Sequence, residues 1–113
     1  MLVQVDALFE GLLGVVLLLG AATGALDSGD FPAPVGTALL LVVGWVLLAL
    51  CGLIWTGRIG TRALALGNGV TAVTGFLWLI LAEGWSTAGA VLVAITVVGL
   101  AGLAAAQAAT LRA

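Results

Sequence analysis

Four long apolar runs, separated by short polar connections, make up most of the chain. The runs cover about residues 7–26, 35–55, 63–82 and 87–108. An α-helix needs about 20 apolar residues to cross a hydrocarbon core roughly 30 Å thick, and each run has about that length. The runs do not show the alternating polarity of the shorter strands in a membrane barrel. The pattern therefore predicts a single all-α domain, residues 1–113, with four transmembrane helices.

The connections predict how these helices are arranged. Residues 27–34 hold two acids and two prolines, and proline ends one helix and is tolerated in the first turn of the next. Residues 56–61 contain two glycines, and residues 83–86 form the third connection. Because links this short place successive helices side by side and antiparallel, we expect an up-down-up-down bundle.

Composition supports a lipid environment and excludes several functions. The chain is 64% hydrophobic and 7% charged, whereas soluble domains carry about 25% charged residues. Its three basic residues cannot build a nucleic-acid surface. One cysteine and no histidine exclude an intrachain disulfide and a Cys/His metal or haem site, so we expect no metal and no cofactor. No nucleophile stands beside a base, so we expect no enzyme activity.

The few charges predict an orientation. Under the four-helix count the basic residues share one side of the membrane and three acids share the other: Arg58, Arg62 and Arg112 against Asp27, Asp30 and Glu83. Because basic connections stay cytoplasmic, we expect both termini in the cytoplasm of a multi-pass cell-membrane protein. Trp45 and Trp78 fall deep in their runs, where we expect them to serve packing.

Small residues recur at spacings that suit close helix packing. They include Gly20 with Gly24, Gly44 with Gly52, Gly67, Gly69 and Gly75, and Gly99, Gly102 and Ala106. In lipid, helices associate through close van der Waals contact, which small residues permit. The spacing is consistent with packing inside the bundle or between subunits.

Polar residues near one end of the apolar runs are the candidates for chemistry, because such residues are costly in a membrane. In one interpretation Asp6 and Glu10 form an ion-pair layer with Arg58 or Arg62, and Asn68 and Gln107, at the same level, make interhelical hydrogen bonds. In the other, Glu10 belongs to a proton or ligand site. Apolar surroundings disfavour a charged carboxylate, so Glu10 could take up and release a proton. The residues of that candidate site are Glu10, Asn68 and Gln107.

The layout resembles the small multidrug resistance transporters. The shared features are the chain length, four short-linked helices, a glutamate early in the first helix and the Gly67-Asn68-Gly69 sequence in the third. The resemblance implies a dimer that exchanges protons for cationic compounds at Glu10.

Two functions follow from these patterns. The first is a structural or interaction protein, either a homo-oligomer or an accessory subunit of a membrane complex, with the lipid bilayer and other membrane subunits as its partners. The alternative is a small proton-linked transporter or channel that uses Glu10.

Overall fold

The computed structural model describes residues 2–32 and 35–112 and is all-helical across them. Its elements are α1 (Leu2–Thr23), a short 3₁₀ helix η1 (Ser28–Asp30), α2 (Thr37–Trp55), α3 (Thr61–Leu81) and α4 (Thr87–Arg112). The four α-helices are long and apolar enough to cross a membrane, which indicates a multi-pass membrane protein.

The helices occupy the expected runs, and the largest differences in their bounds are at the start of the first and the end of the last. α1 begins at Leu2 rather than near residue 7, and α4 continues to Arg112 rather than ending near residue 108. Asp6 was expected at the start of the first helix, just before its apolar run, and the structure places it in the second turn of α1. Pro34 and its neighbour Ala33, which belong to the first connection, lie outside the described residues.

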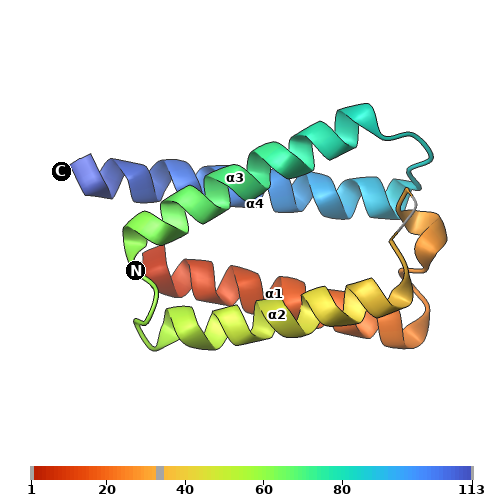
Figure 1. The fold of residues 1–113 in the computed structure, drawn as a ribbon, viewed down its shortest axis with the longest axis horizontal. Coiled ribbons are helices and arrows are strands. Elements are labelled where there is room, and N and C mark those ends of the chain that lie inside the picture. Colours follow the sequence, from red (N-terminus) through yellow and green to blue (C-terminus); the bar gives the residue numbers. More distant parts are fainter. Residues whose placement is uncertain (1, 33–34, 113) are drawn as a thin grey trace.

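The helices form two hairpins. α1 packs along α2, α3 packs along α4, and the two pairs meet mainly where α1 lies against α4 (Figure 1). Successive helices run in opposite directions, so the connection that holds η1 and the α3–α4 connection lie at the same end. α2 and α3 are the helices that diverge from each other.

Glycines permit close contact within each hairpin. A Cβ on Gly14 would lie 2.9 Å from the carbonyl oxygen of Gly44, so α1 and α2 approach too closely there for larger residues. A Cβ on Gly75 would lie 2.8 Å from the side chain of Val97, across the α3–α4 contact. Gly44 and Gly75 were among the glycines expected at helix contacts, whereas Gly14 was not.

The outer surface is apolar, as lipid contact requires. Trp45 was expected to serve packing, but it is 65% exposed and does not pack against the other helices of the single chain. It follows Gly44, which faces α1, and consecutive helical residues point about 100° apart. Trp78, in contrast, does pack internally, against Phe31 and Trp85.

Candidate functional site

A buried polar network joins three helices near the N-terminus of α1. Asn68 of α3 donates from Nδ2 to Asp6 Oδ2 at 2.8 Å, and Gln107 of α4 donates from Nε2 to the same oxygen at 2.6 Å. Asn68 Nδ2 also lies 3.1 Å from Gln107 Oε1, which closes the triangle. Asp6 and Gln107 are completely buried and Asn68 is 6% exposed. The network therefore fastens α1 to the α3–α4 hairpin.

The network leaves part of its hydrogen-bonding capacity unused. Both amide donors bind Oδ2 of Asp6, and Asp6 Oδ1 is buried without a hydrogen-bond partner among the described residues. A buried carboxyl oxygen without a partner costs free energy. The two amide donors offset part of this cost. The loss of either donor should therefore lower the free energy of unfolding.

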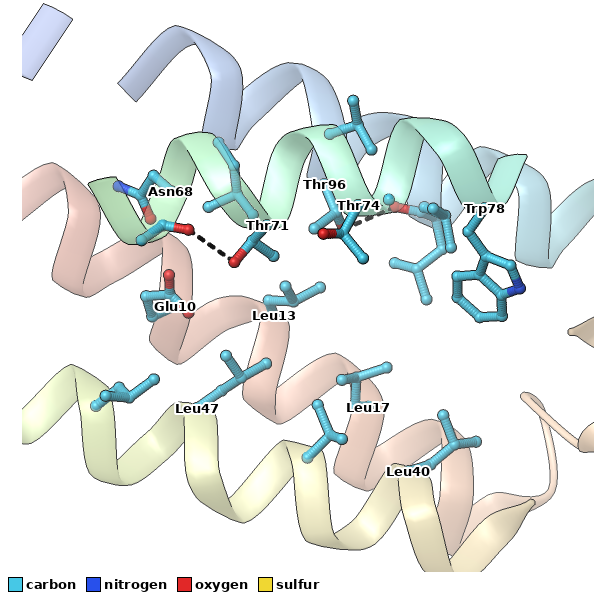
Figure 2. A pocket seen from close by; sticks show the side chains of 18 of the residues that line it. Glu10, Leu13, Leu17, Leu40, Leu47, Asn68, Thr71, Thr74, Trp78 and Thr96 are labelled. Carbon is cyan, nitrogen blue, oxygen red and sulfur yellow. Dashed lines mark hydrogen bonds between the residues drawn. The ribbon is translucent and has the colours of Figure 1, made fainter. Parts of the chain in front are cut away.

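Glu10 lies one helical turn after Asp6, and its carboxyl group points away from α1 toward α3 (Figure 2). Its side chain is 7% exposed, yet it lines the main cavity of the molecule. Among the described residues it takes part in no side-chain hydrogen bond, in contrast to Asp6. Glu10 is thus a buried acid that is free to interact with whatever occupies the cavity.

The cavity lies between the two hairpins and has a volume of about 530 Å³. Glu10 is the one charged side chain among its described lining residues. Most of the others are leucine, valine and isoleucine; the neutral polar ones are Asn68, Thr71, Thr74, Thr96 and the indole of Trp78. Each of the three threonine hydroxyls donates to a carbonyl oxygen one turn earlier in its own helix. The walls are therefore almost entirely apolar, with one carboxyl group near one end.

The other end of the cavity is aromatic. Phe31 and Trp78 both line it and stack with their ring centroids 6.1 Å apart, while Trp85 lies edge-on to Trp78 at 4.6 Å. Beside them the Ser86 hydroxyl donates to Asp30 Oδ1 at 2.6 Å. The cavity thus runs from an acid and an amide at one end to an aromatic cluster at the other.

The structure brings most of the predicted site residues together. Glu10 and Asn68 line the cavity, and Gln107 lies behind Asn68 in the buried network. Arg58 and Arg62 are exposed, and the hydrogen bonds of Asp6 go to amides. An ion pair between these arginines and Asp6 or Glu10 stays a prediction.

Asn68 was identified from the sequence, but the other residues of α3 that line the cavity were not. Asn68, Thr71, Thr74 and Trp78 are spaced three or four residues apart and form one stripe of α3, which Figure 2 shows facing the cavity. Helical spacing could have found this stripe, because side chains three and four apart lie on the same face.

The polar groups at this site are one carboxyl group, one side-chain amide, the Trp78 indole and three threonine hydroxyls that donate to their own helices, and the other walls are apolar. No protein-family model, curated protein or solved structure matches the chain. A carboxyl group in such surroundings can bind a cation or exchange a proton.

Proposed function

We propose that the chain is a small transport protein of the membrane, and that the cavity between its hairpins is the substrate site. One observation carries this proposal: Glu10 is buried, makes no side-chain hydrogen bond to a described residue and lines a cavity of about 530 Å³ with no other charged described residue. A carboxyl group kept only for stability would normally have partners, as Asp6 does.

The walls and the acid together define the substrate class. Apolar side chains suit a molecule with a large hydrocarbon surface, and one carboxylate without a basic neighbour in the cavity attracts positive charge. A proton and an apolar cation would compete for Glu10, which would couple the movement of one to the other. The small multidrug resistance transporters, which the chain resembles in layout, exchange protons and cations at such a glutamate.

Binding of tetraphenylphosphonium, an apolar cation, tests the proposal. We expect Glu10→Gln to weaken binding, measured by calorimetry in detergent, by a factor on the order of 30, because it removes the charge that faces the cation. Glu83→Gln is the matched control, since Glu83 is exposed in the α3–α4 connection, and it should bind as the unaltered protein does. Equal binding by the unaltered protein and Glu10→Gln, with both folded, would contradict the proposal.

We also propose that the chain self-associates or joins other membrane subunits. Gly52 and Gly102 are exposed, and a Cβ on either would meet nothing within 4 Å, so a partner helix could approach closely at both positions. Gly52→Leu and Gly102→Leu should lower energy transfer between labelled copies in bilayers without unfolding the protein. A chain that stays monomeric in bilayers and captures no membrane partner would contradict this proposal.

We also propose an orientation of the chain in the membrane. We place both termini and the connection holding Arg58 and Arg62 on the cytoplasmic side of the cell membrane, and Glu83 on the other side, because basic connections are retained inside. Neither enzyme activity nor nucleic-acid binding forms part of the proposal. In a Cys51→Ala background, an impermeant thiol reagent outside cells should modify Glu83→Cys and leave Thr56→Cys unmodified. The reverse pattern would overturn the orientation.

A further inference from the structure

Three aromatic rings from different parts of the chain close the end of the cavity far from Glu10. Phe31 follows η1, Trp78 belongs to α3, and Trp85 precedes α4. Phe31 is 5% exposed, stacks on Trp78 and meets the ring of Trp85 edge-on at 6.2 Å. Phe31 and Trp78 also line the cavity, so the Phe31 ring forms part of its wall at this end.

Phe31 differs from the other cavity-lining aromatic residue because it does not belong to a long helix. The backbone beside it is held to the start of α4 by one side chain. The Ser86 hydroxyl lies 2.6 Å from Asp30 Oδ1 and 3.2 Å from the Asp30 carbonyl oxygen. The same Ser86 oxygen accepts from the backbone N–H of Gly89 at 3.1 Å, which caps α4.

The close contact between the Asp30 segment and α4 depends on a glycine, Gly89, which has no side chain. A Cβ on Gly89 would overlap the carbonyl group of Asp30, so the segment carrying Asp30 and Phe31 lies directly against α4. The segment therefore packs its backbone against α4 at Gly89, and the Ser86 side chain adds the hydrogen bonding between them.

The opposite end is built differently. There Asp6, Asn68 and Gln107 are buried inside three long helices, and separating them would break bonds between whole helices. At the aromatic end, release of one short segment from Ser86 separates no long helices, and Phe31 is then held by apolar packing in the cluster that includes Leu17, Ala21 and Leu40. Of the two ends, the aromatic one can thus open with the smaller rearrangement.

We propose that Phe31 is a gate of the cavity and that the Asp30–Ser86 contact is the latch that keeps it closed. When the Ser86 hydroxyl releases Asp30, the η1 segment leaves α4, Phe31 withdraws from Trp78 and water reaches the cavity from this end. What the gate admits rests on the proposed function. The opening itself does not, because it requires neither a substrate nor Glu10.

Modification of a cysteine placed in the cavity measures the opening. Thr74 lines the cavity and is exposed in the isolated chain, so the test needs lipid to cover the open side of the cavity. In a Cys51→Ala background, Thr74→Cys puts a thiol beside Trp78, and a sulfonated maleimide serves as the charged probe. The protein is held in lipid nanodiscs, where both ends face water and lipid blocks the sides. Ser86→Ala should raise the modification rate about fivefold, the factor expected for losing a typical net hydrogen bond. Ser86→Thr, which keeps the hydroxyl, should restore the original rate.

Two further variants separate gating from loss of structure. Thr37→Cys is exposed near the same end, and its modification rate should not respond to Ser86→Ala. Asp30→Ala removes the other half of the latch and should act as Ser86→Ala does. If neither latch variant raises the rate at Thr74→Cys above that of Ser86→Thr, the proposal is wrong. If Ser86→Ala raises the rates at Thr37→Cys and Thr74→Cys equally, the effect is general loosening and the latch is likewise refuted.

The test remains separate from that of the proposed function. The effect of Ser86→Ala on Thr74→Cys should persist when Glu10→Gln is added. Failure of tetraphenylphosphonium to bind would therefore contradict the transport proposal but not the gate. An unchanged modification rate at Thr74→Cys would contradict the gate but not the transport proposal.

Discussion

At one end of the cavity Asp6 joins α1 to α3 and α4 through two side-chain amides, whereas at the other end Phe31 packs against two tryptophans. Hydrocarbon offers no hydrogen bonds, so lipid cannot compete for the Asp6 contacts. Aromatic rings, in contrast, find apolar partners readily and are frequent near membrane surfaces. The polar end is thus suited to hold a fixed geometry beside Glu10, and the aromatic end is suited to move.

Among single substitutions at the two ends, we expect the largest loss of stability at the aromatic end. Phe31→Ala removes a ring that is almost fully buried and that touches both tryptophans. The ring also belongs to a buried apolar cluster with Leu17, Ala21 and Leu40 of α1 and α2. We expect the free energy of unfolding in detergent to fall by about 3 kcal/mol. A loss below that of Gln107→Leu would reverse the ranking of the two ends.

Gln107→Leu tests the polar end. It removes one of the two donors to Asp6 and the acceptor that faces Asn68. We expect a loss of about 2 kcal/mol in the free energy of unfolding, because the Asp6 carboxyl group keeps a single partner. Thr110→Val is the matched control one turn later, where the hydroxyl donates only to its own helix, at the carbonyl of Gln107. Equal losses for the two variants would show that the network adds little stability.

The smallest effect is expected at an aromatic residue that belongs to neither end. Trp45 is 65% exposed on the outer face of α2. Trp45→Leu should change the free energy of unfolding in detergent by no more than about 0.5 kcal/mol. A large loss would mean that Trp45 is buried by a second copy or another subunit, and the same variant should then lower self-association.

The helices could be predicted from the sequence because lipid imposes a simple rule on length and polarity. The start of α1 could not, because Asp6 interrupts the apolar pattern and its two partners lie in α3 and α4, far along the chain. Asn68 and Gln107 were noticed for being polar in apolar runs, but nothing local in the sequence shows that both bind the same carboxyl oxygen.

The cavity could not be predicted from the sequence either. Its walls are mostly leucine, valine and isoleucine, the residues that would equally pack against one another or face lipid. The structure is needed to show that residues of all four α-helices line one cavity, and Figure 1 shows that α2 and α3 diverge. Glu10 could be proposed as a site residue from its position in α1, but the sequence could not show that it makes no side-chain hydrogen bond to a described residue.

Proton release on cation binding tests the central claim, that Glu10 is the exchange group of a substrate cavity, most directly. Tetraphenylphosphonium is added to the purified protein in weakly buffered detergent near neutral pH, and a pH-indicator dye reports the protons released. If proton and cation compete for Glu10, binding should release protons from the unaltered protein and from Glu83→Gln, and none from Glu10→Gln. Binding without release, or equal release from Glu10→Gln, would contradict the claim.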